Sequence, residues 1–316
     1  MPRKKNKTAD EIKTDEGRIF QLIDLAWESS SPERTLAIAE QILEINPNRV
    51  EGLILKADHT DDTQVSVNCL KKALSALKNP DNCLEGDKNV LFLTINQRLA
   101  LAYLKLENFD EAFEYCKTAI KFYEKYLDAD DVDVDASNSN ILMKNVYYKI
   151  LIERKAWQQI LQDSMRDPDI TLGRAYARLL AAWFITPENP GGNRSVCANL
   201  FWDALAIAPN VPFYITNYFE EPDDNAPPEA MEEYRFALMY YDIVSITDDF
   251  SEWFVRGILL FGLFSGRFEE RERDYVIDAL DDFGGYGDYE KMKKIIVGTE
   301  DSEVIEALAA NKCLAN

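Results

Sequence analysis

The sequence predicts an all-α protein, built as an α-solenoid of antiparallel helical hairpins that becomes degenerate towards the C-terminus. Apolar residues recur at spacings of three and four over long segments, as amphipathic helices require. The sustained period-two alternation of strands is missing. The 12 prolines and most of the 13 glycines lie at junctions between these segments. Together these patterns predict a chain of paired helices.

Each apolar segment predicts one helix, and short polar or Pro-containing stretches separate neighbours. Pro47 ends the second helix, because proline lacks an N–H and forces the preceding residue out of helical geometry. The expected helices span 17–29, 33–45, 49–59, 64–77, 89–106, 109–127, 139–153, 156–165, 170–185, 195–208, 228–246, 251–265, 268–282, 288–296 and 301–312.

The same patterns divide the chain into five parts. Residues 1–14 form a basic tail, expected to be disordered, that carries Arg3, Lys4, Lys5 and Lys7. Helical hairpins follow over 15–127, and an acidic loop over 128–140 separates them from divergent hairpins over 141–266. Residues 267–316 are expected to form a C-terminal helical cap.

One hairpin, residues 96–125, carries the spacing of a known helical repeat. Its large and small apolar residues fall where two antiparallel helices must approach closely, and they are Leu99, Ala100, Tyr103, Phe109, Ala112 and Ala119. The pattern resembles the tetratricopeptide repeat, with Cys116 where an aromatic residue is usual and Glu107 where glycine is usual. The resemblance implies stacked hairpins whose first helices line a concave surface suited to a peptide or a partner's helix.

A narrower resemblance covers residues 190–253. Gly192-Asn-Arg-Ser195 is followed by Ala204-Leu-Ala-Ile-Ala-Pro-Asn-Val-Pro-Phe-Tyr214, which resembles the NPHVPxYL region of the suppressor of tumorigenicity 7 family and of related bacterial repeat proteins. Ala208 and Asn210 replace the asparagine and histidine of that motif. The resemblance implies kinship within the repeat class and no established chemistry.

Composition restricts the partners and the compartment. The 35 basic against 56 acidic residues give a net charge of −21, which disfavours direct binding to nucleic acid or an anionic membrane. No apolar stretch approaches the roughly 20 residues that span a bilayer. The five cysteines are scattered and form no CxxC pair, as expected of reduced thiols in a cytoplasmic protein.

Few residues suggest catalysis, a metal or a cofactor. His59, the single histidine, lies in a polar stretch at a helix end, where a capping or solvated role is expected. Asp131, Asp133 and Asp135 imitate the start of an EF-hand, but Ala136 and Leu142 stand where its glycine and its final carboxylate belong. Phe283-Gly-Gly-Tyr-Gly-Asp-Tyr289 lacks the lysine of a phosphate-binding loop and is expected to be a turn. We therefore expect no catalytic residue, no metal site and no cofactor.

Recognition of another protein is the expected function. The concave surface implied by the repeat alignment would include Glu51, Ile54, Asp58, Thr94, Gln97, Leu101, Lys105, Asn145 and Lys149. Residues 220–252 add eleven acidic residues against Arg235 alone, and Glu229, Glu232 and Glu233 are its central acids. We expect a non-catalytic scaffold for a peptide or helix of a partner protein, a basic one if the acidic stretch takes part.

Two alternatives stay open at this point. The acidic surface could imitate nucleic acid and occupy a nucleic-acid-binding protein, or a pair of carboxylates in one cleft could serve a hydrolase or transferase. The partner's identity and the oligomeric state are not determined by the sequence.

Overall fold

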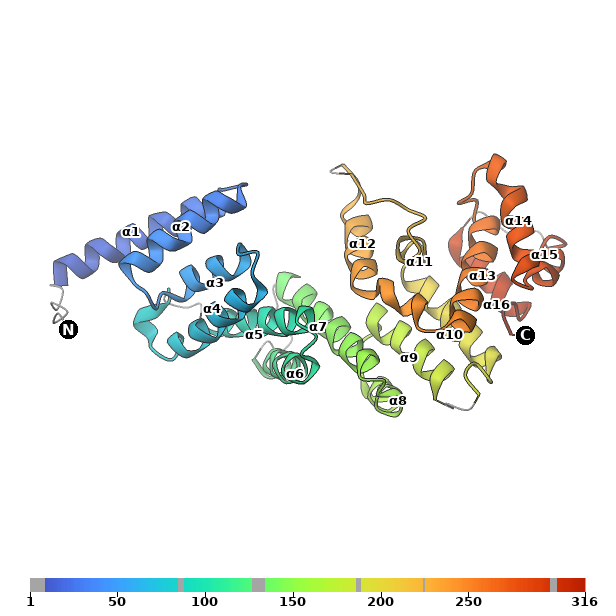
Figure 1. Ribbon diagram of the computed structural model, residues 1–316, viewed down its shortest axis with the longest axis horizontal. Coiled ribbons are helices and arrows are strands. Elements are labelled where there is room, and N and C mark those ends of the chain that lie inside the picture. The colour runs from blue at the N-terminus through green and yellow to red at the C-terminus, as the bar shows by residue number, and fades with distance from the viewer. Residues whose placement is uncertain are drawn as a thin grey trace. The chain divides into compact units, whose positions relative to one another are not determined.

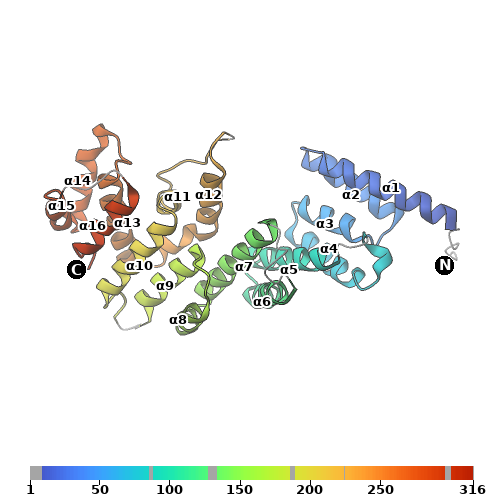
Figure 2. The same ribbon diagram turned by 180° about the vertical axis from the view of Figure 1, so that it is seen from behind.

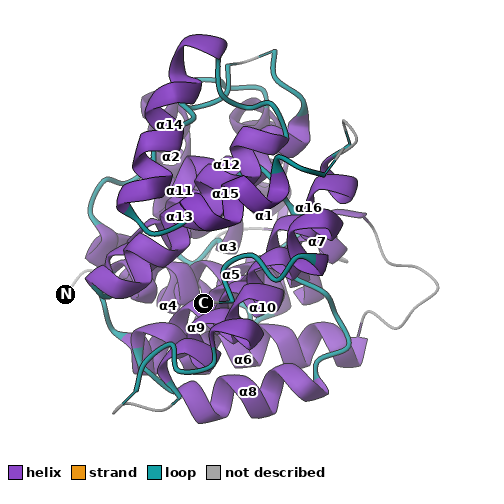
Figure 3. Cartoon of the chain, turned by 90° about the vertical axis from the view of Figure 1, so that its right-hand side faces the viewer, coloured by secondary structure: helices purple, strands orange, loops and turns teal. Residues whose placement is uncertain are grey.

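The chain folds as a succession of helices joined by short loops. A computed structural model describes residues 9–84, 88–126, 134–185, 189–223, 225–295 and 300–315. Within these ranges the regular structure consists of α-helices and short 3₁₀ helices, and Figure 3 shows helices and loops without a strand. The predicted all-α class is confirmed.

The helices form two compact units. The N-terminal unit comprises residues 1–146 and the C-terminal unit comprises residues 147–316. The boundary falls inside helix α7, which runs from Val134 to Glu153.

In the N-terminal unit, each helix packs against the next one along the chain. The order is α1 (Ala9–Trp27), α2 (Pro32–Ile45), α3 (Val50–Asp58), α4 (Thr63–Ala76), the 3₁₀ helix η1 (Pro80–Asn82), α5 (Lys88–Lys105) and α6 (Phe109–Tyr126). Figures 1 and 2 show α1 beside α2, α3 beside α4 and α5 beside α6. Ser31 caps α2 and Asp62 caps α4, because their side-chain oxygens accept hydrogen bonds from free backbone N–H groups of the first turn.

Small residues allow α5 and α6 to approach closely. Ala100, Ala112 and Ala119 are fully buried, and the Cys116 thiol donates to the Met143 carbonyl at 3.1 Å. Glu107 ends α5 in the left-handed region, with φ of 54°, while the Asn108 N–H reaches back to the Tyr103 carbonyl at 2.9 Å. This helix ending normally uses glycine, so Glu107 adopts a conformation that costs a side-chain-bearing residue about 1 kcal/mol.

The C-terminal unit begins with sequential packing and then departs from it. Helices α8 (Trp157–Arg166), α9 (Leu172–Phe184) and α10 (Arg194–Ile207) pack in order, whereas α16 (Asp301–Ala310) packs on both α10 and α13 (Asp248–Phe264). Its other elements are α11 (Val211–Ile215), α12 (Pro228–Tyr240), η2 (Tyr241–Ser245), η3 (Glu270–Glu272), α14 (Arg273–Asp282) and α15 (Tyr286–Met292).

Aromatic side chains fill the core of the C-terminal unit. Trp183 of α9 lies 4.9 Å from Trp253 and 5.2 Å from Phe250, both on α13, measured between ring centroids. Phe201 of α10 meets Trp253 edge to face at 5.7 Å. All four of these aromatic residues are buried. Helices α9, α10 and α13 therefore share one core.

Several predicted boundaries are wrong. Helix α1 begins at Ala9, so the last six residues of the predicted tail are helical, and residues 1–8 lie outside the described residues. Helix α7 begins at Val134 and takes in the second half of the predicted acidic loop, whose first half also lies outside them. The helix predicted over 228–246 is divided between α12 and η2. Helix α11 is missing from the predicted helices, because five residues are too few for apolar periodicity to reveal a helix.

Candidate functional site

The predicted concave residues of the N-terminal unit fall into two groups. Thr94, Gln97 and Leu101 lie half-buried along α5, and Lys105 is exposed at its end. The Asp58 carboxylate forms an ion pair with Arg98 and so links α3 to α5. These residues occupy accessible positions, whereas Glu51 does not.

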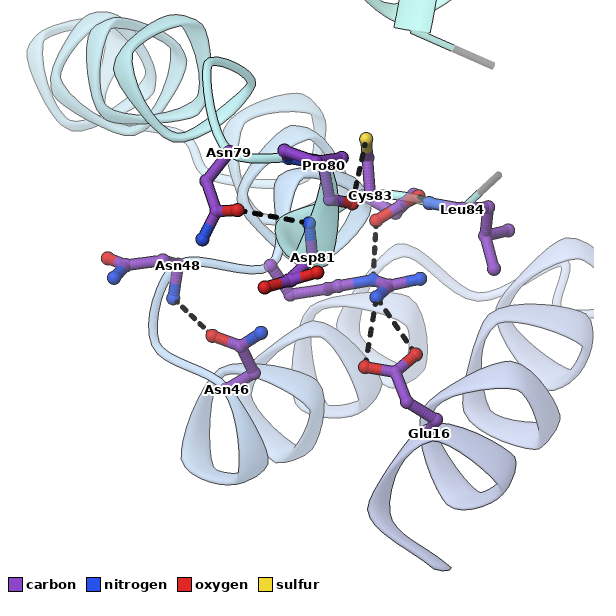
Figure 4. A network of polar contacts seen from close by, with 10 residues as sticks. Glu16, Asn46, Asn48, Asn79, Pro80, Asp81, Cys83 and Leu84 are labelled. Atoms are coloured by element: carbon purple, nitrogen blue, oxygen red, sulfur yellow. Dashed lines mark hydrogen bonds and ion pairs between the residues drawn. The ribbon is translucent and has the colours of Figure 1, made fainter. Parts of the chain in front are cut away.

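Glu51 belongs to a polar network around a buried arginine. Arg49 is 1% exposed, and its guanidinium lies 3.1 Å from the Glu16 carboxylate and 2.7 Å from the Glu51 carboxylate. Glu51 also accepts a hydrogen bond of 2.7 Å from the Leu84 N–H. Figure 4 shows the Glu16 side chain pointing from its helix towards the turn that holds Cys83. Arg49 thereby joins α1, α3 and the segment after η1, which indicates a structural role for Glu51.

Asn145 and Lys149 were expected on a concave surface, and the structure contradicts this. Both are buried, with exposed fractions of 8% and 5%. The Lys149 ammonium lies 2.5 Å from both the Glu153 and the Asp242 carboxylates. A buried ammonium needs such charged partners, so Lys149 fastens α7 to η2.

The turn between α7 and α8 carries a groove in the C-terminal unit, which we call the α8 groove. Its volume is about 730 Å³, and its lining comprises Lys155, Ala156, Trp157, Gln158, Gln159, Gln162, Asp163 and Ile185. A smaller hollow of about 90 Å³ adjoins it and is lined by Lys149, Ile152, Glu153, Lys155, Trp157, Asp242, Ile243 and Ile246. Lys155 and Trp157 line both spaces.

Local geometry places Trp157 in the wall of this groove. Lys155 has φ of 53°, and the Ala156 N–H donates to the Leu151 carbonyl at 2.9 Å, which ends α7 and turns the chain. Trp157 then opens α8, and its ring stacks on Phe184 at 5.3 Å. The ring is therefore fixed on one face and half-buried.

The polar lining of the α8 groove is partly engaged and partly free. Tyr147 donates a hydrogen bond of 2.6 Å to Asp163, and Gln159 donates one of 3.4 Å to Tyr147. Gln158 and Gln162 are exposed, and their amides make no hydrogen bond to any part of the chain that the structure describes. A free primary amide both donates and accepts, as a peptide backbone does.

The three predicted acids of α12 do not act alike. Glu229 and Glu232 are exposed, but Glu233 turns inward and accepts a hydrogen bond of 3.0 Å from the Asn210 amide. Burial raises the pKa of Glu233, and the Asn210 hydrogen bond and the nearby Arg267 charge oppose that shift. The expectation that Glu233 shares a free acidic surface is wrong.

Arg267 organises the remainder of that network. Its guanidinium forms two parallel bonds to Asp301, at 2.8 and 2.9 Å, and also donates to the Asn210 side-chain oxygen. The guanidinium carbon lies 4.5 Å from the centre of the Phe261 ring. A bidentate ion pair of an arginine that also stacks on an aromatic ring is a strong interaction. Here it holds α13 and α16 against the turn before α11.

The remaining motifs are structural within the described residues. His59 is the C-cap residue of α3. Asp288 is 8% exposed, and its carboxylate accepts a hydrogen bond from the Leu314 N–H at 3.2 Å. The aspartates of the EF-hand-like stretch fall where side chains lie outside the described residues. In the described ranges, no cluster of three or more His, Cys, Asp or Glu could hold a metal ion.

No described helix combines the length and the apolar content needed to cross a bilayer. Comparison of the chain with protein-family models, with curated proteins and with solved structures finds no match.

Trp157 is the main residue of the groove that the sequence did not reveal. Its place directly after the turn that ends α7 was the available signal.

Proposed function

We propose that this protein is a non-catalytic interaction scaffold that binds an extended, basic segment of a partner protein in the α8 groove. The observation that carries the proposal is the Trp157 ring, which forms a wall shared by the groove and its adjoining hollow. Aromatic residues in such positions supply much of the binding energy in protein interfaces, because they bury a large area with few rotatable bonds.

The free amides beside Trp157 suit a peptide backbone. Gln158 and Gln162 are four residues apart on α8, about one helical turn, so their side chains share its rim. An extended peptide presents N–H and C=O groups that pair with such amides. An apolar side chain of the peptide would then rest on Trp157.

The charge of the whole chain favours a basic peptide, whereas the charges that line the hollow are balanced, with Lys149 and Lys155 against Glu153 and Asp242. Asp242, which lines the hollow, keeps 44% of its side chain exposed although it pairs with Lys149. It lies in η2, directly after α12, and the exposed residues of these two elements include Glu229, Glu232, Leu238 and Tyr241. The net charge of −21 would speed the encounter with a basic partner.

We further propose that the hairpins belong to a tetratricopeptide-like α-solenoid. The packing of each helix from α1 to α6 on its successor supports this arrangement. The left-handed ending at Glu107, at the position where the repeat usually has glycine, also supports it.

Selection from a random peptide library tests the proposed function. We expect the intact protein to enrich peptides that pair an apolar residue with Lys or Arg, and we expect Trp157→Ala with Gln162→Ala to lose at least about tenfold in affinity for them. Tyr275→Ala, which removes an exposed ring on α14, is the matched control and should bind as the parent does. Circular dichroism of each variant verifies that the helices remain.

The charge component has its own test. Glu229→Lys with Glu232→Lys should slow association at low salt and have little effect near 0.5 M salt, where the Debye length is about 4 Å. Enriched peptides that bind the Trp157→Ala with Gln162→Ala variant as tightly as the parent would contradict the proposal. Competition by DNA or RNA for a captured protein would instead favour the nucleic-acid mimic.

A further inference from the structure

Helix α1 presents two large aromatic side chains on its surface, which we call the α1 aromatic stripe. Phe20 is 52% exposed and Trp27 is 82% exposed. They are seven residues apart, so at about 100° per residue they lie on the same side of the helix, roughly 10 Å apart along its axis. Both belong to the N-terminal unit and are independent of the α8 groove.

The stripe takes no part in the hairpin's own core. A different side of α1 supplies Ile19, Leu22, Ile23 and Ala26, which pack with Ile38 and Ile42 of α2. Phe20 and Trp27 therefore add apolar surface without stabilising the α1–α2 contact. Large exposed aromatics of this kind typically mark an interaction surface.

Charge around the stripe selects its partner. Asp24 lies between the two aromatics on nearly the same side of the helix, and Glu28 follows within about a quarter turn; both are exposed. Of the two basic residues of α1, Arg18 lies about 160° away from the stripe, and Lys13 precedes Phe20 by seven residues. A second copy would bring acids against acids, in a chain whose net charge is already −21.

We propose that the α1 aromatic stripe docks a cationic amphipathic helix of a partner protein. The apolar face of that helix covers Phe20 and Trp27, and its flanking Lys or Arg side chains reach Asp24 and Glu28. Helix-on-helix recognition of this kind uses apolar anchors spaced by whole turns, and two aromatics seven residues apart provide them.

Two synthetic helices serve as probes. Both are labelled peptides of about 18 residues with the same leucine face, and their polar positions are all Lys in one and all Glu in the other. Fluorescence anisotropy with the full chain should show binding of the Lys peptide alone. We expect Phe20→Ala with Trp27→Ala to weaken that binding at least about tenfold, and Asp24→Lys with Glu28→Lys to weaken it at least about threefold.

Helix α14 provides matched controls. Its Tyr275 is 77% exposed, and Asp274 and Asp278 are exposed acids with the same four-residue spacing as Asp24 and Glu28. Tyr275→Ala, and Asp274→Lys with Asp278→Lys, should leave the affinity for the Lys peptide within about twofold of the parent's. Because the substituted side chains of α1 point away from α2, its variants should keep the parental circular dichroism and melting temperature.

Three results would overturn the proposal. Equal affinity of the stripe variants and the parent would place the peptide elsewhere on the acidic chain. Equal affinity for the Lys and Glu peptides would show that Asp24 and Glu28 do not select a cationic partner. A dimer seen by sedimentation velocity, and abolished by Trp27→Ala, would make a second copy the occupant. None of these results depends on the α8 groove, whose own test uses variants of the C-terminal unit.

Discussion

A single arginine holds three segments of the N-terminal unit together. Arg49→Met removes the buried guanidinium and leaves the Glu51 carboxylate, 11% exposed, without its charged partner. We expect the free energy of unfolding of this unit to fall by about 3 kcal/mol, because an uncompensated buried charge is costly. Urea titration with hydrogen exchange of α3 amides measures this. Arg18→Met, an exposed change on α1, should cost little, and an equal loss in the two variants would contradict the role of Arg49.

Glu233 makes stability depend on pH. Its pKa is raised in the folded protein, so the unfolded chain gives up this proton at a lower pH than the folded chain does. Ionisation of Glu233 therefore costs stability as pH rises through its folded pKa, and the full cost is present above that value. Glu233→Gln removes the ionisation and keeps an oxygen that can accept from Asn210. We expect the Gln variant to melt above the parent at about pH 7.5, by a margin that narrows towards about pH 5.

The control for this prediction lies on the same helix. Glu232→Gln changes an exposed acid and should leave the melting temperature close to the parent's at both pH values. A Gln variant at position 233 that melts below the parent at neutral pH would mean that its ionised form is stabilised by Arg267 more than burial disfavours it.

The sequence predicts the positions of small apolar residues better than the surroundings of charged ones. It placed Ala100, Ala112 and Ala119 in a helix contact, where they are buried, because small size at a fixed spacing has one structural use. It misplaced Lys149, Glu51 and Glu233, because a charged residue looks the same in sequence whether it faces solvent or a buried partner. The partners Asp242, Arg49 and Asn210 come from other turns or helices, and periodicity within one helix cannot reveal them.

At the scale of elements, a glycine allows α13 to approach α10 and the C-terminal segment. A Cβ atom at Gly257 would lie 2.6 Å from the Phe201 ring and 2.8 Å from the Leu314 side chain. Gly257→Ala should therefore destabilise the C-terminal unit by about 1–3 kcal/mol through overpacking, although alanine favours a helix more than glycine does. Thermal melting measures the loss.

Gly287 provides the comparison for Gly257. It lies in α15, where an added Cβ atom would meet no neighbouring atom within 4 Å, so Gly287→Ala should be neutral or slightly stabilising. Equal destabilisation by both substitutions would mean that backbone freedom, and not the close approach of α13, is what Gly257 provides.

Helix positions followed from the sequence where an amphipathic stripe was long. The predicted ranges for α2, α3, α4, α5 and α10 agree with the structure within a residue or so at each end, because caps and breakers such as Ser31, Pro47 and Asp62 flank them. Agreement was poorer where polar sequence continues a helix, as at the starts of α1 and α7. Composition favoured a loop over 134–140, yet a helix can extend into polar residues once its later turns are anchored in a core.

At the scale of the whole molecule, the two compact units have separate cores. Aliphatic residues of α1 and α2 form one cluster in the N-terminal unit, whereas closely packed aromatic rings of α9, α10 and α13 fill the core of the C-terminal unit. Units with their own cores can unfold separately, since few side chains would lose partners in the unit that stays folded. The chain should therefore show two unfolding transitions in urea.

Arg49→Met and Gly257→Ala assign these transitions to the two units. Arg49→Met should lower the urea midpoint for amides of α1–α4 and leave the midpoint for amides of α9–α13 unchanged. Gly257→Ala should lower the midpoint for amides of α9–α13 and leave that of α1–α4 unchanged. Hydrogen exchange followed by peptide mass spectrometry measures the two midpoints separately. If either substitution lowered both midpoints equally, α7, which crosses the boundary between Val146 and Tyr147, would have to couple the units into one cooperative structure. With separate transitions, the groove on the C-terminal unit and the aromatic stripe on the N-terminal unit would act as independently folded binding surfaces, so that one chain could hold two basic partners.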